Sequence, residues 1–183
     1  MNEHIARLED GIAWEIELAR HLGEWGWAVA PFGTATLPGV VSLGRLRDGG
    51  PPPGELYKAL MSYRRADGKP SGLRWLPDII AGRGDQLCLI DAKSERRPSM
   101  NYAVELRALA VGSVIEQQLF TPVYYIWPDA GVLTPSHFTR REVTVKVSRP
   151  ESFHDRGSGT PFALIPKRFA TPAAEIFGNI TGG

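Results

Sequence analysis

The sequence has only one cysteine among 183 residues, and it has no long apolar run. One cysteine cannot form an internal disulfide bond, so the fold has to be held by a packed core, for which the chain is long enough. Spanning a bilayer takes about 20 consecutive apolar residues, and the first residues lack the basic start and apolar core of a secretory signal. We therefore expect a single domain over residues 1–183, located in the cytoplasm and without a membrane partner.

Histidine and lysine are also scarce, with four and five residues. The histidines lack metal-ligand spacing, which argues against a zinc site. The net charge of +1 is lower than that of many nucleic-acid-binding proteins. Positive charge is nevertheless uneven, with seven basic residues between positions 45 and 74 and a second cluster made of Arg140, Arg141, Lys146 and Arg149. Because phosphate binding depends on local potential, these clusters keep nucleic acid open as a ligand.

Two apolar stretches, each with an acid at one end, follow one another at residues 74–80 and 87–93. A short glycine-containing turn joins them, which predicts a β-hairpin. In that hairpin Asp78 lies beside Asp91, and Asp91 shares a strand face with Lys93 because side chains alternate along a strand. Two carboxylates and an ammonium group at one end of a sheet can hold a hard divalent cation and an activated water.

An amphipathic helix is predicted at residues 5–25, where apolar residues recur at helical spacing. At about 100° per residue these side chains form one stripe, and Glu15 lies within it. A carboxylate on a core-facing stripe needs a partner, because an unpaired buried charge is costly. A bound metal or Lys93 would be such a partner; the alternative is that Glu15 lies at the edge of the stripe and reaches solvent.

The other elements follow from periodicity and turn residues. They are a strand at 27–32, a helix at 102–120 with Ser99 or Asn101 as its N-cap, a strand at 122–127, and strand candidates at 143–147 and 162–165. The helix is apolar on two sides, which indicates burial between layers or a dimer contact. Residues 33–72 are a long basic insertion rich in glycine and proline, which predicts a flap that contacts substrate, and residues 131–183 form a short β-containing C-terminal extension.

Pro77-Asp78, twelve intervening residues and then Asp91-Ala92-Lys93 resemble the motif of the PD-(D/E)XK nuclease superfamily, which has the restriction-endonuclease-like fold. Glu15 resembles the glutamate that the superfamily commonly carries on its first helix. The resemblance covers about residues 5–130. It implies an α/β fold in which helices flank a central mixed sheet, with core elements in the order αβββαβ.

The resemblance further implies a metal-dependent endonuclease that hydrolyses phosphodiester bonds of DNA. Asp78, Asp91 and Glu15 would bind Mg²⁺, with Mn²⁺ as a substitute, and Lys93 would orient the attacking water, so that all four residues are catalytic. DNA is the implied partner, and a homodimer is a mild expectation because duplex DNA has two strands to cut. Restriction-like cleavage, junction resolution, repair-type nicking and a phage or mobile-element role all stay open.

Two alternatives belong to other classes. One is a non-catalytic nucleic-acid-binding or structural protein that retains the nuclease fold. The other is an unrelated α/β protein in which the motif occurs by chance. The presence of all four residues argues against a degenerate site, because a protein freed from catalysis has little reason to keep them.

Overall fold

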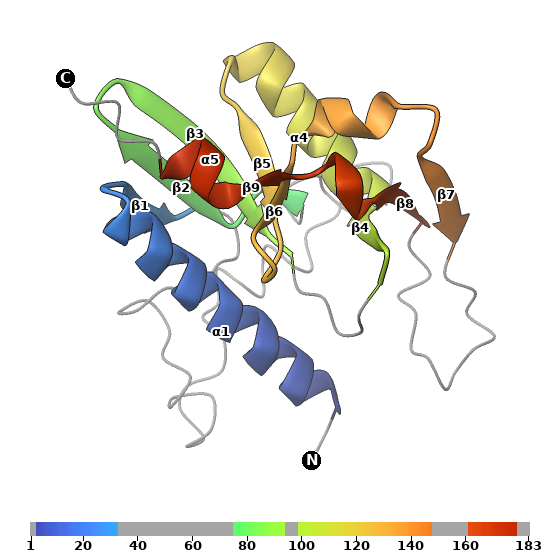
Figure 1. Cartoon of the computed structure of the whole chain (residues 1–183), viewed down its shortest axis with the longest axis horizontal. Coiled ribbons are helices and arrows are strands. Elements are labelled where there is room, and N and C mark those ends of the chain that lie inside the picture. Colours follow the sequence, from blue (N-terminus) through green and yellow to red (C-terminus); the bar gives the residue numbers. More distant parts are fainter. Residues whose placement is uncertain (1–2, 33–74, 94–98, 148–160, 179–183) are drawn as a thin grey trace, which may run out of the picture.

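The computed structural model describes residues 3–32, 75–93, 99–147 and 161–178 (Figure 1). Short 3₁₀ helices carry the label η. The elements are α1 Glu3–Glu24, β1 Ala28–Pro31, β2 Ile79–Arg83, β3 Gln86–Ala92, β4 Asn101–Glu105, α4 Leu106–Leu119, β5 Val123–Ile126, β6 Gly131–Leu133, η2 Pro135–Thr139, β7 Thr144–Val147, β8 Pro161–Pro166, η3 Lys167–Phe169, β9 Thr171–Pro172 and α5 Ala173–Phe177.

The strands form two sheets. The main sheet has six strands in the order β1-β2-β3-β5-β6-β9, and the smaller sheet has three in the order β4-β8-β7. β3 and β5 run parallel, and the other neighbouring pairs are antiparallel. The predicted class, α/β with a mixed sheet and flanking helices, is confirmed at this level, but β4 interrupts the predicted order αβββαβ between β3 and α4.

α1 covers one face of the main sheet (Figure 1). Its buried side chains Trp14, Leu18 and Leu22 belong to a core cluster with Cys88 and Ile90 of β3. Burial raises the pKa of the Cys88 thiol to about 12. The thiol therefore stays protonated, and Cys88 acts as a packing residue.

α4 lies on the opposite face of the main sheet. Because side chains alternate along β3, Leu89 points away from the α1 side. Leu89 belongs to a second core cluster with Ala108 and Ile115 of α4 and with Val123 and Tyr125 of β5. The Tyr125 hydroxyl also donates a hydrogen bond to the carbonyl of Ala108 at 3.1 Å. The main sheet is thus the middle layer between two helices.

Residues 101–105 form strand β4. The helix predicted at 102–120 therefore starts too early, and this part of the prediction is wrong. β4 pairs with β8 along its whole length, with Tyr102 and Val104 buried on one face. Val104 also fits the helical spacing of the residues after it, which is why periodicity assigned it to the helix. The pairing with a strand far along the chain decides the conformation instead.

α4 therefore starts at Leu106, with Glu105 at its N-cap. The predicted caps are wrong: the Ser99 hydroxyl accepts a hydrogen bond from the backbone N–H of Asn101 at 3.1 Å, in the turn before β4. Phe120 follows the last turn in the left-handed conformation, with φ 53°. This conformation ends the helix.

The C-terminal extension completes both sheets. The predicted strands at 143–147 and 162–165 are confirmed as β7 and β8, and β6 and β9 widen the main sheet. Phe177 of α5 is fully buried. Its carbonyl accepts hydrogen bonds from Trp27 Nε1 at 3.0 Å and from Arg83 at 2.9 Å. The extension is thus bonded to the loop before β1 and to β2.

The insertion predicted at 33–72 lies outside the described residues, so its role as a basic flap stays a prediction. The same holds for Arg149 of the second basic cluster. Within the described ranges, none of the helices has the length and apolarity needed to cross a membrane.

Gly131 lies against the ring of Tyr102. A Cβ atom at Gly131 would be 2.0 Å from the Tyr102 hydroxyl oxygen and 2.6 Å from its Cζ. The ring cannot easily shift, because it stacks on Trp127 with centroids 4.0 Å apart and donates a hydrogen bond to Asp129. We expect Gly131→Ala to lower the free energy of unfolding by about 1–3 kcal/mol, measured by urea denaturation.

Gly11→Ala is the matched control, because nothing lies within 4 Å of a Cβ atom at that position in α1. An alanine in a helix is favoured over glycine, so this variant should be more stable than wild type by about 0.5–1 kcal/mol. Wild-type stability in Gly131→Ala would contradict the tight packing of Tyr102.

Candidate active site at the ends of β2 and β3

The β2–β3 hairpin brings Asp78 to the end of β3. The register pairs Ile79 with Ile90, so Asp78 and Asp91 occupy the next positions outward. Asp78 Oδ2 accepts a hydrogen bond from the backbone N–H of Ala92 at 2.9 Å. The prediction that the hairpin places the two carboxylates side by side thus agrees with the register.

Asp91 and Lys93 lie on the same side of the strand end, as alternation predicted. Lys93 Nζ is 2.7 Å from Asp91 Oδ2, and the two side chains are only 20% and 10% exposed. The backbone N–H of Lys93 donates to the carbonyl of Ile126 at 2.8 Å, which continues the pairing of β3 with β5. The Lys93 ammonium also lies 5.7 Å from the centre of the Tyr125 ring. The sheet and its core therefore fix both charged groups in place.

The local electrostatics show an excess of negative charge. Burial raises the pKa of Asp78 well above its ordinary value, and the nearby carboxylates of Asp91 and Glu15 raise it further. Burial alone would lower the pKa of Lys93, but Asp91, Asp78 and Glu105 together raise it. One ammonium group thus faces several carboxylates, an arrangement that favours binding of a further cation.

Glu15 lies on the buried side of α1. Leu18 and Leu22, three and seven residues further on, are buried, and Glu15 itself is partly buried. Its effect on the pKa of Asp78 places it in the same electrostatic environment. Among the described residues, however, no three His, Cys, Asp or Glu side chains converge closely enough to hold a metal ion. The structure therefore brings Asp78, Asp91 and Lys93 together, and Glu15 acts on them through its electrostatic effect on Asp78.

The donor set nevertheless fits magnesium. Mg²⁺ is a hard cation that keeps several waters and is usually bound by one or two carboxylates. Asp78 and Asp91 supply two carboxylates, and the partly buried Asp78 lies among like charges that a cation would neutralise.

Three further residues at this end of the sheet were not identified from the sequence. Trp75 Nε1 donates to Glu105 Oε2 at 2.8 Å, and the Arg107 guanidinium carbon lies 4.8 Å from the centre of the Trp75 ring. Glu105 contributes to the raised pKa of Lys93. Only the pairing of β4 with β8 assigns Glu105 to a strand end, because the apolar spacing that includes Val104 also fits a helix.

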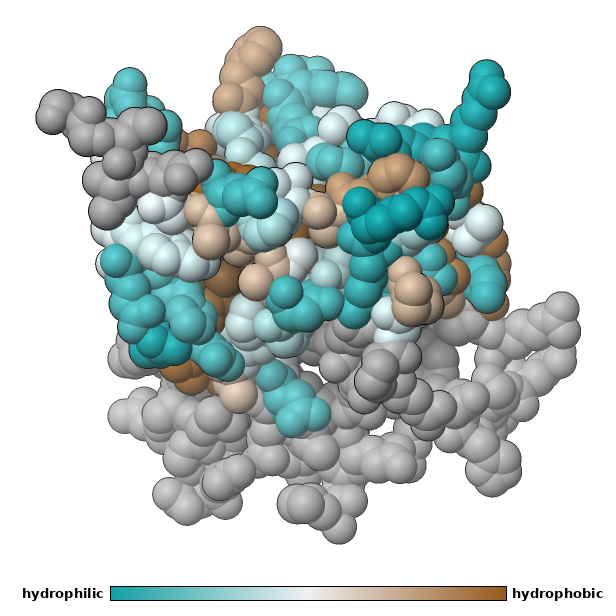
Figure 2. Space-filling model, viewed as in Figure 1, coloured by the Kyte–Doolittle hydropathy of each residue, from teal (hydrophilic) through white to brown (hydrophobic). Residues whose placement is uncertain are grey.

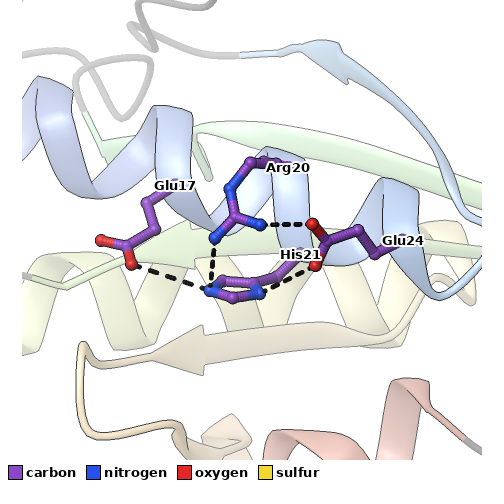
Figure 3. Close-up of polar contacts among 4 residues, drawn as sticks. All are labelled: Glu17, Arg20, His21 and Glu24. Atoms are coloured by element: carbon purple, nitrogen blue, oxygen red, sulfur yellow. Dashed lines mark hydrogen bonds and ion pairs between the residues drawn. The ribbon is translucent and has the colours of Figure 1, made fainter.

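A second polar cluster lies on the exposed face of α1 (Figure 3). His21 is 3.3 Å from a carboxylate oxygen of Glu24 and 3.7 Å from one of Glu17, and Arg20 pairs with Glu24. These side chains are one-third to more than half exposed. The cluster is a solvated ion-pair network.

Comparisons with known proteins give little beyond this geometry. No protein-family model and no curated protein matches the chain. Among solved structures, Hjc, a Holliday junction resolvase from the archaeal hyperthermophile Archaeoglobus fulgidus, is similar with a TM-score of 0.49 and 16% sequence identity, covering 92% of this chain and 100% of that one. Because a likeness this distant says nothing about chemistry, the function has to be inferred from the residues of this chain.

Asp78→Asn should stabilise the metal-free protein. The raised pKa of Asp78 means that its charged form is disfavoured in the folded state. Asparagine removes the charge and keeps an oxygen that can accept the Ala92 N–H. We expect the free energy of unfolding in EDTA at neutral pH to rise by about 1 kcal/mol, measured by urea denaturation.

This gain should depend on pH. Because the pKa of Asp78 is higher in the folded state than its ordinary value of 3.8, wild type gains stability as the pH falls toward that value. The advantage of Asp78→Asn should shrink over the same range and disappear below it. Asp85→Asn, in the exposed hairpin turn, is the control and should change little. A destabilised Asp78→Asn at neutral pH would be evidence against a strained carboxylate.

Proposed function

We infer that this chain is a metal-dependent endonuclease that hydrolyses phosphodiester bonds of DNA. The inference depends on one observation. The Asp78 carboxylate is shielded from water and lies near the carboxylates of Asp91 and Glu15, and the nearby Lys93 is ion-paired with Asp91. A folded protein gains nothing from such a cluster unless it binds a cation or carries out a reaction there. The motif residues and the α/β architecture support the same assignment.

In the proposed reaction, Asp78 and Asp91 would hold the divalent ion, and Glu15 would assist directly or through water. Mg²⁺ or Mn²⁺ would supply Lewis-acid activation of a water and neutralise charge on the scissile phosphate. Lys93 donates hydrogen bonds to the attacking water and to the negative charge that develops on the phosphate. Asp91 keeps the Lys93 ammonium in place at 2.7 Å. Hydrolysis leaves the phosphate on one side of the cut and a hydroxyl group on the other.

Glu105 and Trp75 would support Lys93 from the other side. The Glu105 carboxylate attracts the ammonium, and the hydrogen bond from Trp75 limits where that carboxylate can point. The proposed partner is DNA. The predicted homodimer and the cytoplasmic location stay predictions.

Cleavage of a mixed DNA panel tests the proposal. Supercoiled, linear, single-stranded and branched DNA are each incubated with Mg²⁺ or Mn²⁺. Asp78→Ala, Asp91→Ala and Lys93→Ala should each lower the cleavage rate by about 100-fold or more, because each removes a group aimed at the reacting atoms. Glu15→Gln should cost less, about 10- to 100-fold, as for a residue that acts through a bound water.

Asp85→Ala is the control for the two aspartates, because it removes an exposed carboxylate at the other end of the same hairpin. It should cut DNA at the wild-type rate. Cleavage that survives in Asp91→Ala and Lys93→Ala would refute this active site. DNA binding without cleavage of any substrate would favour the non-catalytic nucleic-acid-binding protein instead.

A further inference from the structure

Two arginine side chains pack against the aromatic ring of Phe169. The guanidinium carbon of Arg140 lies 5.0 Å from the ring centre, and that of Arg168 lies 4.8 Å from it. The two cations are therefore no more than about 10 Å apart, which is one Debye length at 0.1 M salt. Phe169 itself is partly buried against the second core cluster, so the ring is fixed in place.

Neither arginine is neutralised within the part of the chain that the structure describes. Arg140 and Arg168 are exposed and have no carboxylate at ion-pair distance there. Two other cations differ: Lys167 is 2.7 Å from Asp129, and Arg20 pairs with Glu24. Arg140 also lies near His137 and lowers its pKa, after burial, which has the larger effect. Within the described ranges, the two guanidinium groups on Phe169 therefore keep their positive charge without an ion-pair partner.

Figure 2 shows where this surface lies. Strongly hydrophilic side chains gather over the region of η2 and η3. A short series of contacts connects this region to the candidate active site. Lys167, next to Arg168, lies 4.8 Å from the centre of the Tyr102 ring, which stacks on Trp127. Trp127 directly follows Ile126, whose carbonyl accepts the backbone hydrogen bond from Lys93.

We propose that Arg140 and Arg168 form a binding surface for the phosphate backbone of DNA. The proposal rests on the proposed function, because it names where the substrate of that site is held. A guanidinium group matches a phosphate in shape, and two of them within one Debye length can contact neighbouring phosphates. Packing on Phe169 orients both groups before DNA arrives, so less side-chain freedom is lost on binding. Arg141, Glu142 and Lys146 are exposed in the same segment and together add one further positive charge.

The test is the salt dependence of DNA binding, measured by fluorescence anisotropy with a labelled duplex in EDTA so that no cutting occurs. Each phosphate contact that is lost should reduce the slope of log K against log salt by about 0.9. Arg140→Gln and Arg168→Gln should each weaken binding roughly two- to fivefold and reduce the slope by about 1, and the double variant should reduce it by about 2. The loss should be the same for duplexes of unrelated sequence.

Two controls separate charge at this surface from other effects. Arg20→Gln removes an exposed arginine of α1 that Glu24 already neutralises, and its slope should equal that of wild type. The Arg140→Lys, Arg168→Lys double variant keeps both charges and should keep the wild-type slope. Thermal denaturation of each variant verifies that the fold is retained.

The outcomes are distinct from those of the cleavage assay. An unchanged slope in the Gln double variant, in a protein that binds and cuts DNA, overturns this surface and leaves the proposed function intact. Equal losses in the double variant and in Arg20→Gln also overturn it, because net charge would then be responsible. A reduced slope in a chain that never cuts DNA supports the surface and refutes the nuclease. Failure of wild type to bind any DNA refutes both.

Discussion

The register of the β2–β3 hairpin is the constraint on which the rest of the site depends. Pairing of Ile79 with Ile90 puts both side chains into the core beneath α1 and turns Asp91 and Lys93 to the other face. A slip of one residue would reverse every side chain of the strand, burying charge under α1 and exposing apolar groups. The two core clusters on opposite faces of β3 oppose such a slip, and the bond from the Ala92 N–H to Asp78 fixes the outer end.

This arrangement has an energetic cost that the rest of the fold offsets. Charged Asp78 is disfavoured by burial and by neighbouring carboxylates, so the end of the sheet that would carry the chemistry is locally strained. At the other end of β2, Arg83 donates to the carbonyls of Trp25 and Phe177, and its guanidinium lies 4.7 Å from the centre of the Trp27 ring. The C-terminal helix thus stabilises the hairpin far from the charges. The contacts of Arg83 that stabilise the hairpin and the charged residues of the candidate site therefore lie at opposite ends of the same two strands.

The parts of this structure that the sequence predicted are those determined by local patterns. Alternation along residues 87–93 was enough to put Asp91 and Lys93 on one face, and helical spacing was enough to put Glu15 on the core side of α1. β4 could not be predicted in this way, because its conformation depends on β8, which lies far along the chain. Glu105 was missed for the same reason. Its position near Lys93 follows from a strand boundary that only the tertiary pairing reveals.

The surface around Phe169 illustrates the same limit. The sequence analysis placed Arg140 in a basic cluster with Arg141, Lys146 and Arg149, whereas the arginine that shares an aromatic ring with it is Arg168, which no sequence pattern singled out. The smaller sheet brings them together, since β7 and β8 pair and the segments that flank them meet at one aromatic ring.

The same sheet bonds to the β5–β6 turn through Tyr102, Asp129 and Lys167. These hydrogen bonds connect the segments that carry Arg140 and Arg168 to the strand ends that hold Lys93. The distance between the two arginines and Lys93 is therefore set by the packing of the fold. A DNA segment bound at both proposed places would accordingly have to match a fixed spacing of phosphates, and contacts of this kind position the nucleic acid without reading its sequence.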